Sequence, residues 1–211
     1  MDNFIHINTF CSLIKVSRET ITSLKIFEEQ LKKANKTLNL ISKSTLNNIW
    51  GRHFLDSAQL IDFIDKNDKI IIDLGSGAGF PGLIIAIMAK DRRIDMKVKL
   101  IEKSPKKVKF LNQIIKKLNL NVETINQNVF EETNDIAGDV IVARAFKPLQ
   151  EFLTLIHNKA INWKKIIVFL GKTGKEQLLQ ASNSWDIQYK QRISITSSDS
   201  IIIEVNKLKK K

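Results

Sequence analysis

Residues 69–82 read K-I-I-I-D-L-G-S-G-A-G-F-P-G, and this stretch decides the fold. Its three consecutive isoleucines predict a buried parallel strand, because helices cover both faces of such a strand and no polar alternation is needed. Four glycines follow within eight residues, and they let the backbone turn sharply and come close to a ligand. The apolar run after Pro81 predicts a helix with that proline near its first turn. Strand, glycine-rich loop and helix together predict a nucleotide-type cofactor site.

The position of the acid relative to the glycines separates two cofactor classes. The window from Gly77 to Gly82 matches the dinucleotide fingerprint G-x-G-x-x-G, which keeps an NAD(P)-dependent oxidoreductase as an alternative. In that fingerprint, however, the first glycine follows the strand directly. Here Asp73 ends the strand and the glycines start two residues earlier, at Gly75, which resembles the first motif of S-adenosylmethionine-dependent methyltransferases. We therefore favour S-adenosylmethionine as the cofactor, with Asp73, Gly75, Ser76 and Gly77 among its candidate binding residues.

After the glycine-rich loop, strand-like and helix-like segments alternate as in a doubly wound α/β fold. Seven strands are predicted, near residues 70–73, 96–102, 121–126, 139–144, 165–170, 185–195 and 200–207. The last two form an antiparallel hairpin, which is the Rossmann-like architecture of the class I S-adenosylmethionine-dependent methyltransferases. Residues 1–66 read as a helical N-terminal extension, although residues 1–15 show no clear pattern. Residues 67–211 read as the methyltransferase domain, and we expect both parts to form one structural unit.

Composition excludes several classes of protein. The single cysteine, Cys11, excludes an internal disulfide and a cysteine-rich metal site, and the three histidines have no metal-ligand spacing. No apolar run approaches the roughly 20 residues that a membrane span needs. The first residues lack the basic and apolar regions of a secretory signal. We expect a cytoplasmic monomer without a metal site or membrane contact.

The net charge points to a polyanionic partner. With 34 basic and 22 acidic residues the formal charge is +12, which favours nucleic acid first and an anionic membrane surface second. Twenty-eight of the basic residues are lysines, and A/T-rich coding, which also raises isoleucine and asparagine, is an alternative source of the charge. Two lysine groups stand out, one on the outer face of the helix after residue 104 and one in a mobile C-terminal tail. Their members are Lys106, Lys109, Lys116 and Lys117, and Lys207, Lys209, Lys210 and Lys211.

Two charged residues at predicted strand ends complete the candidate site. Glu102 ends the second strand, where a carboxylate can accept hydrogen bonds from both ribose hydroxyls of an adenosine. An exposed carboxylate beside Lys103 is the alternative, and the glycine-rich loop favours the functional interpretation. Arg144 follows the fourth strand, so we expect it in the crevice at the carboxyl ends of the strands. It could pair there with the cofactor carboxylate or an RNA phosphate, or with an acid such as Asp139.

Two absences narrow the atom that is methylated. Enzymes that methylate exocyclic amines usually carry an Asn/Asp-Pro-Pro-aromatic tetrad after the fourth strand, where residues 142–148 here read V-A-R-A-F-K-P. Methylation at pyrimidine C5 generally requires a cysteine nucleophile in the catalytic domain, and Cys11 lies far upstream of it. A ring nitrogen with a free lone pair needs neither device, and guanine N7 is such an atom.

Four segments together resemble one known family in order and spacing. They are R-H-F-L-D-S (52–57), I-D-L-G-S-G-A-G-F-P-G (72–82), S-P-K-K-V-K-F-L (104–111) and A-R-A-F (143–146). The family is the bacterial small-subunit ribosomal RNA methyltransferase G family, also called glucose-inhibited division protein B, and the resemblance covers roughly residues 20 to 205. It implies S-adenosylmethionine-dependent methylation of N7 of one guanine near the decoding centre, with 16S rRNA or the small ribosomal subunit as partner. It also implies cofactor contacts at Gly75, Phe80, Val129, Phe130 and Arg144.

Two segments depart from the family pattern. The family's N-R-x-E after the third strand is here N-Q-N-V-F-E (126–131), which preserves a backbone contact to adenine but not a side-chain contact. The family's late L-K-G appears as L-G-K-T-G (170–174), so Lys172 is an inexact match. The candidates for catalytic roles are Arg144, Lys172 and His53, and their individual roles stay unassigned. Arg52 and Asp56 share a helix face, where they form either an ion pair or part of the site. A non-catalytic RNA-binding relic of the fold is a further alternative.

Overall fold

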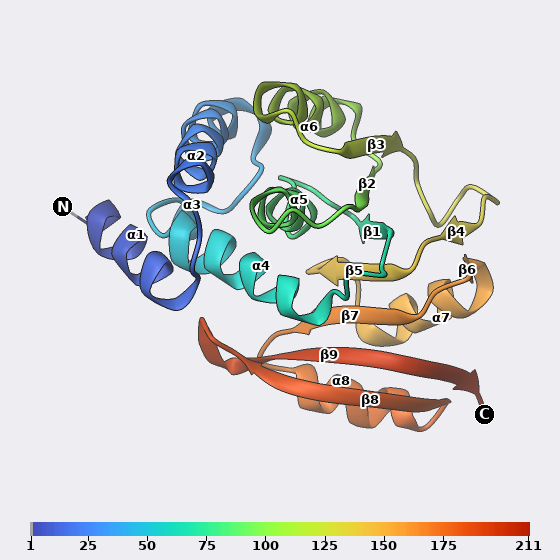
Figure 1. Ribbon diagram of the computed structural model, residues 1–211. Helices are drawn as coiled ribbons and strands as arrows, with labels where there is room; N and C mark the ends of the chain where they lie inside the picture. The colour runs from blue at the N-terminus through green and yellow to red at the C-terminus, as the bar shows by residue number, and fades with distance from the viewer. Residues whose placement is uncertain (1) are drawn as a thin grey trace.

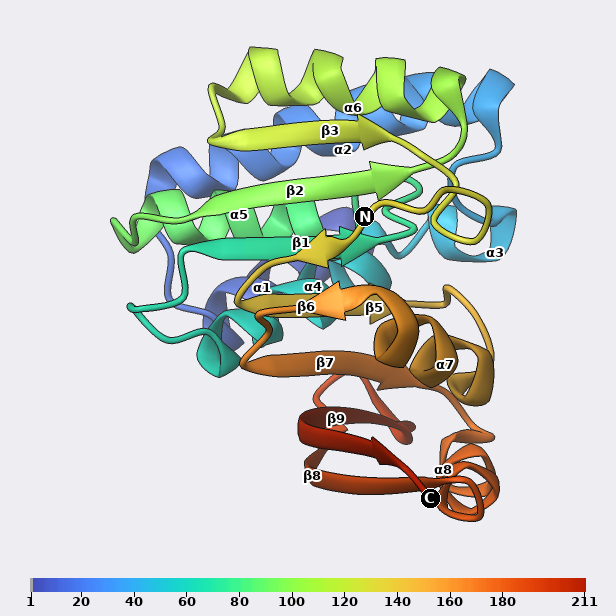
Figure 2. The same ribbon diagram turned by 90° about the vertical axis from the view of Figure 1, so that its right-hand side faces the viewer.

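The computed structural model describes residues 2–211, and a seven-stranded sheet forms its centre (Figures 1 and 2). The strands are β1 (Ile70–Leu74), β2 (Lys97–Glu102), β3 (Val122–Asn126), β5 (Val140–Arg144), β7 (Lys165–Leu170), β8 (Trp185–Ser194) and β9 (Ser197–Lys210). Their order is β3-β2-β1-β5-β7-β9-β8, with β9 antiparallel to both of its neighbours and all other pairs parallel. The seven predicted strands and the closing hairpin are confirmed. A short pair, β4 (Ile136–Ala137) and β6 (Ala160–Ile161), lies beside the sheet.

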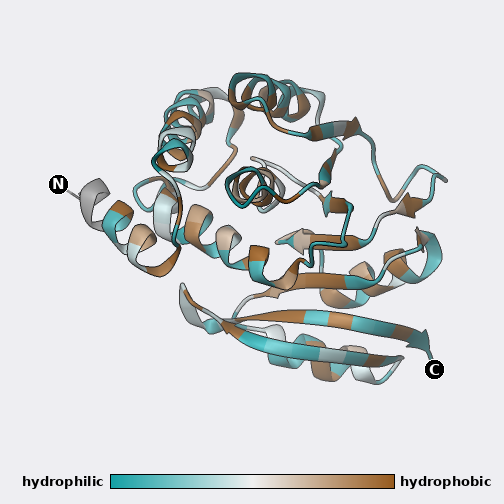
Figure 3. Cartoon of the chain, viewed as in Figure 1, coloured by the Kyte–Doolittle hydropathy of each residue, from teal (hydrophilic) through white to brown (hydrophobic). Residues whose placement is uncertain are grey.

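Helices cover both faces of this sheet, as the continuous isoleucine run predicted. Ile71 of β1 packs into the hydrophobic cluster on one face and Ile72 into the cluster on the other, because successive residues of a strand point to opposite sides. The first face carries α1 (Asp2–Leu13), α2 (Arg18–Leu38), α3 (Lys43–Leu46), η1 (Trp50–Leu55), α4 (Asp56–Ala58), η2 (Gln59–Phe63), α5 (Gly82–Asp91) and α6 (Pro105–Leu118). The second face carries α7 (Leu149–Lys159) and α8 (Gly174–Ser182). Figure 3 shows apolar residues on the sides of the helices that meet the sheet.

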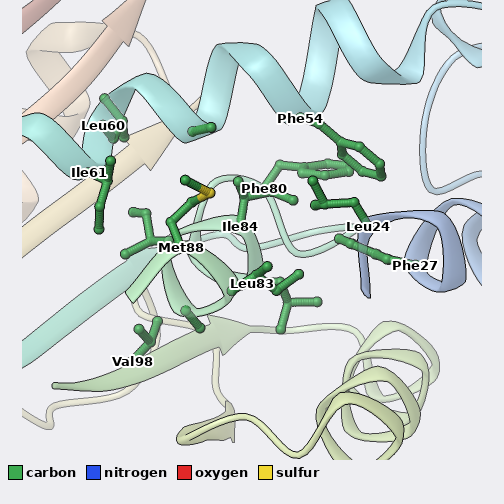
Figure 4. Packing of buried hydrophobic residues seen from close by; sticks show 14 of the residues in the cluster. Leu24, Phe27, Phe54, Leu60, Ile61, Phe80, Leu83, Ile84, Met88 and Val98 are labelled. Atoms are coloured by element: carbon green, nitrogen blue, oxygen red, sulfur yellow. The ribbon is translucent and has the colours of Figure 1, made fainter. Parts of the chain in front are cut away.

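The N-terminal helices share the core of the sheet domain. Phe27 of α2 stacks on Phe54 of η1 and on Phe80 of the glycine-rich loop, with ring centroids 5.5 and 5.4 Å apart (Figure 4). One hydrophobic cluster therefore runs from α2 through η1 to α5, across the predicted boundary between residues 66 and 67. The two segments therefore share one hydrophobic core.

Two segments differ from the expectations drawn from sequence. Residues 1–15 showed no pattern, yet α1 forms there, and its Phe10 packs edge-on against Trp50 at 5.4 Å. Tertiary packing, and not a helical periodicity, holds this helix. The expected mobile C-terminal tail is wrong, because β9 extends to Lys210, which pairs with Trp185 of β8. Among residues 2–211, no helix is long and apolar enough to cross a bilayer. Among the side chains that the structure describes, those of residues 6–211, no group of three metal-ligating side chains occurs.

Candidate cofactor site

A cavity of about 220 Å³ lies where the parallel strands β1, β2, β3 and β5 end. Figure 2 shows that the arrowheads of β1, β2 and β3 point to the same edge of the sheet, which is where ligands bind in open α/β folds. Four of the predicted cofactor-binding residues line the cavity, namely Gly75, Glu102, Val129 and Phe130. The structure also brings in residues that sequence reasoning did not select for the site: Lys103, Lys107, Gln127, Asn128, Phe146 and Lys147.

The glycine-rich loop is shaped by its backbone. The amides of Gly75 and Ser76 donate to the carbonyl of Ile101 on the neighbouring strand, at 2.9 and 3.1 Å. Gly75 has a φ of 72°, a conformation that side chains disfavour. A Cβ added there would lie 2.2 Å from the ring of Phe146, so the loop and this ring meet only because residue 75 is glycine. Ser76 is buried, and its hydroxyl donates to the carbonyl of Asp73 at 3.0 Å.

Asp73 lies beneath the loop and is not among the residues that line the cavity. Its Oδ2 accepts a hydrogen bond from the amide of Gly82 at 2.9 Å, at the first residue of α5. Its Oδ1 has no hydrogen-bond partner among the described residues, and complete burial raises the pKa of this carboxyl to about 7. The geometry therefore gives Asp73 the role of fixing the loop to the start of α5.

Glu102 connects the loop to the next helix and still faces the cavity. Its Oε2 accepts from the amide of Gly77 at 2.9 Å, and its Oε1 accepts from the amide of Ser104, directly before α6, at 2.8 Å. A carboxylate offers about four acceptor positions, so two of them remain for a ligand. This arrangement suits a carboxylate that accepts from ribose hydroxyls while it keeps its own position.

Arg144, at the end of β5, forms a hydrogen-bond network beside the cavity. Its Nη1 donates to Oδ2 of Asp56 at 3.3 Å and to the carbonyl of Arg52 at 3.2 Å, and its Nη2 donates to Nδ1 of His53 at 2.8 Å. Its guanidinium carbon lies 5.1 Å from the centre of the Phe80 ring. Arg52, His53 and Asp56 lie on or directly after η1, a π-helical turn, and such turns are frequent at functional sites.

Two alternatives drawn from sequence are corrected by this network. Asp139 is not the partner of Arg144, because its carboxylate accepts from the backbone amides of Lys69 and Ile70 instead. The Arg52–Asp56 pair does not form either, since Asp56 pairs with Arg144. Spacing along one helix identified the face but not the residue from β5 that meets it.

Asp56 also connects the site to the C-terminal hairpin. Its Oδ1 accepts from the hydroxyl of Ser194 at 2.8 Å, from the hydroxyl of Thr196 at 2.6 Å and from the side-chain Nε2 of Gln59 at 3.1 Å. Ser194 ends β8, and Thr196 lies in the turn before β9. Sequence reasoning missed these partners, because Ser194 lies 138 residues from Asp56 and carries no motif.

The rings of His53 and Phe80 stack on each other, and Arg144 contacts both. Phe80 is 4% exposed, and its ring stacks on that of His53 with 4.9 Å between centroids and 16° between planes. Figure 4 shows Phe80 among the core side chains beside Phe54. His53 Nδ1 accepts from Arg144, so the ring proton belongs on Nε2, which lies 3.0 Å from the hydroxyl of Thr45. Burial, and then the charges of Arg144 and Arg52, lower the pKa of His53 to about 3.

His53 is expected to stay neutral throughout the physiological pH range. A pKa near 3 in the folded protein, against 6.5 for a free histidine, means that the unfolded chain takes up the proton first. His53 therefore favours the folded state above pH 6.5, and this contribution is lost as the pH falls from 6.5 toward 3. NMR titration of the His53 ring should show no midpoint between about pH 5 and 8. A His53→Gln variant should lose less stability on acidification than wild type, and a midpoint above about pH 5 would contradict this.

The remaining candidates lie apart from the Arg144 network. Lys172 follows β7 with a side chain that is 85% exposed, 4.0 Å from the carboxylate of Asp199, and it does not line the cavity. Phe130 is 43% exposed and stacks on Phe146 with 5.7 Å between ring centroids. The A-R-A-F motif was the one sequence signal that could have placed Phe146 in the site.

Comparison with known proteins gives consistent matches over nearly the whole chain. The GidB family model, described as rRNA small subunit methyltransferase G, matches residues 20–203. The protein named Ribosomal RNA small subunit methyltransferase G of Pelagibacter ubique (strain HTCC1062) is 43% identical over 198 residues, which cover 93% of this chain and 92% of that protein. The protein of the same name from Rickettsia felis is 36% identical over 198 residues, covering 94% and 99%.

Solved structures share the fold at low sequence identity. The 16S rRNA methylase RmtB aligns with a TM-score of 0.56 at 16% identity, over 95% of this chain and 79% of that one. M. capricolum TrmK, in complex with S-adenosyl-homocysteine, aligns with a TM-score of 0.54 at 18% identity, over 72% of this chain and 67% of that one. At these identities the likeness concerns the fold.

Proposed function

Because this chain belongs to the rRNA small subunit methyltransferase G family, we propose that it transfers a methyl group from S-adenosylmethionine to N7 of a guanine in small-subunit 16S rRNA. The observation that supports the cofactor most directly is the cavity at the carboxyl ends of the parallel strands, with Gly75 and Glu102 in its lining and Arg144 at the end of the adjoining strand. The carboxyl edge of such a sheet is the general ligand site of the fold.

The residues present fit this cofactor. Gly75 lines the cavity without a Cβ, which would collide with the ring of Phe146, so the loop backbone can approach the amino-acid part of the ligand there. Glu102 keeps free acceptor positions for the ribose hydroxyls, and Val129 and Phe130 border the space for the adenine. Arg144 does not line the cavity but directly precedes Ala145, which does, and we propose that its fixed cation pairs with the carboxylate. Asp73, Ser76 and Gly77 hold the loop in shape.

The reaction depends more on the positioning of the two reactants than on acid–base catalysis. S-adenosylmethionine supplies a methyl group on a sulfonium, and a neutral thioether is the leaving group. Guanine N7 attacks with its lone pair, so no proton has to be removed beforehand. His53 stays neutral and bonded to Arg144, and it is not needed as a base. We propose that His53 and Asp56 position Arg144, and that the site acts by aligning the two reactants and excluding water.

The alternatives have less support. An NAD(P)-dependent oxidoreductase rested on the match of residues 77–82 to a dinucleotide fingerprint, and this chain belongs to a methyltransferase family instead. A non-catalytic relic of the fold would need neither a glycine at residue 75, where a Cβ would collide with a neighbouring ring, nor a Glu102 that is bonded to the glycine-rich loop. The proposal includes a monomer acting in the cytoplasm, where its ribosomal substrate is located.

Transfer of tritium from S-adenosylmethionine to small ribosomal subunits tests the proposal. The subunits come from a strain that lacks the endogenous activity, and the labelled nucleoside is identified after digestion of the RNA. Label in 7-methylguanosine is the expected result, and subunits from a strain that retains the activity should accept none. Label in a different nucleoside would overturn the N7 assignment but keep the cofactor. Absence of label from both subunits and naked rRNA would overturn the proposed substrate.

A further inference from the structure

The positive charge of this chain is concentrated in two segments, residues 30–55 and residues 103–122. The first contains five basic residues and the second six, and neither contains an Asp or a Glu. They therefore carry +11 of the net charge of +12, and the rest of the chain is nearly neutral. Lysines also occur elsewhere in the chain, where acidic residues balance them, and A/T-rich coding does not explain why these two segments contain no acidic residue.

The fold places the two segments side by side. Helix α2 packs beside α6, as Figure 1 shows, and a groove of about 670 Å³ lies between α6 and residues 30–38 of α2. Four lysines line this groove: Lys33 from α2, and Lys106, Lys109 and Lys117 from α6. None of the four forms an ion pair within the described part of the chain.

Two neighbouring surfaces extend the same charge. A second groove of about 920 Å³ lies between α2 and α3 and is lined by Lys32, Lys36 and Lys43, of which Lys32 also pairs with Glu28 at 2.7 Å. On the other side, Lys103 and Lys107 belong to the lining of the cofactor cavity. In Figure 2, α3 and the start of α6 lie at the edge of the sheet toward which the arrowheads of β1, β2 and β3 point. The basic surface thus begins at the cofactor cavity and continues over α6, α2 and α3.

We propose that the α2–α6 groove with its two extensions, which we call the lysine face, binds the sugar-phosphate backbone of rRNA beside the target guanine. The proposed function makes RNA the substrate, and the lysine face adds the surface that holds it. Its grooves present lysine, asparagine, glutamine, serine and threonine side chains, which are the usual partners of phosphate and sugar oxygens. Contacts of this kind fix the position of the RNA, and the cavity then selects the base.

Two features favour RNA over a protein partner for this surface. Protein interfaces usually centre on exposed apolar or aromatic anchors. The large apolar side chains that are exposed among the described residues all lie outside residues 30–55 and 103–122. The one phenylalanine in the α2–α6 groove, Phe110, is only 3% exposed, so it offers no ring for stacking. The surface therefore exposes lysines but no large apolar or aromatic anchor, which suits phosphates.

The test compares two variants with the same change in charge. The first replaces the groove lysines, as Lys33→Gln, Lys106→Gln, Lys109→Gln and Lys117→Gln. The control replaces exposed lysines of α8 and the β8–β9 hairpin, as Lys175→Gln, Lys190→Gln, Lys209→Gln and Lys210→Gln. Binding of each protein to small subunits and to 16S rRNA is measured between about 0.05 and 0.2 M salt, with S-adenosylmethionine binding measured in parallel.

The groove variant is expected to bind RNA at least about tenfold more weakly, with a salt slope reduced by about 3, and to bind S-adenosylmethionine as wild type does. The control should keep the wild-type slope. Equal loss in both variants, or an unchanged slope in the groove variant, would overturn the lysine face. If the groove variant also loses cofactor binding, the double variant Lys36→Gln with Lys43→Gln replaces it in the test, because these two residues lie away from the cavity. Wild-type RNA binding by this double variant would then overturn the proposal. If only the lysine-face proposal is wrong, the wild-type protein still methylates guanine in small subunits. If the proposed function is wrong, the wild-type protein does not methylate guanine at all.

Discussion

The Arg144→Met variant is expected to lose S-adenosylmethionine affinity by roughly 10- to 100-fold, because a charge-assisted hydrogen bond contributes about 1.5–3 kcal/mol. Methionine retains much of the length and apolar contact of arginine, so packing against Phe80 changes less than the charge does. Equilibrium binding and the kcat/KM for methyl transfer are the measurements. We expect both to fall together if Arg144 holds the cofactor.

A structural role of Arg144 must be separated from a binding role. Removing the arginine leaves the carboxylate of Asp56, which is only 14% exposed, without its cation. This should lower the free energy of unfolding by about 1–3 kcal/mol, although Ser194 and Thr196 still donate to Asp56. The double variant Asp56→Asn with Arg144→Met removes the unpaired charge, so its stability should recover while its cofactor affinity stays low. Recovery of both would show that Arg144 acts only on the structure.

The Arg144 network shows where sequence reasoning succeeds and where it stops. The position of Arg144 at the carboxyl edge of the sheet was predictable from sequence. Arg144 ends a short apolar run, and the length of this run and its place in the strand–helix alternation are local features that identify a parallel strand. Its partner was not. Asp139 is close in sequence, whereas Asp56 lies 88 residues away, directly after the π-helical turn η1, and only the packing of the N-terminal helices brings it to β5.

The same distinction applies to the rest of the site. Gly75, Glu102, Val129 and Phe130 line one cavity as their positions after β1, β2 and β3 suggested, since parallel strands end at one edge. Asp73 was grouped with them from the motif, but a strand residue that faces the helix layer is covered by the helix that follows. The merging of two lysine-rich segments into one surface also depends on how α2 packs against α6, which no local pattern encodes.

The Gly75→Arg variant is expected to abolish methyl transfer, with activity at least about 1,000-fold below wild type. Residue 75 has a φ of 72° and lines the cofactor cavity, so a long charged side chain both strains the backbone and fills the binding space. Transfer of tritium to small subunits and S-adenosylmethionine binding are the measurements, and thermal unfolding checks that the variant is folded. Wild-type transfer by this variant would mean that the glycine-rich loop does not hold the cofactor.

A matched pair of alanine substitutions shows whether geometry at residue 75 causes the loss. At Gly75 a new Cβ would lie 2.2 Å from the ring of Phe146, whereas at Gly171 it would have nothing within 4 Å. Backbone strain alone costs about 1–2 kcal/mol at a positive φ, so Gly75→Ala should reduce both stability and cofactor affinity. Gly171→Ala should change neither, because Gly171 has no such φ and its Cβ meets open space. If the two variants behave alike, the loss in Gly75→Arg comes from the size and charge of arginine and not from a backbone that only glycine can adopt.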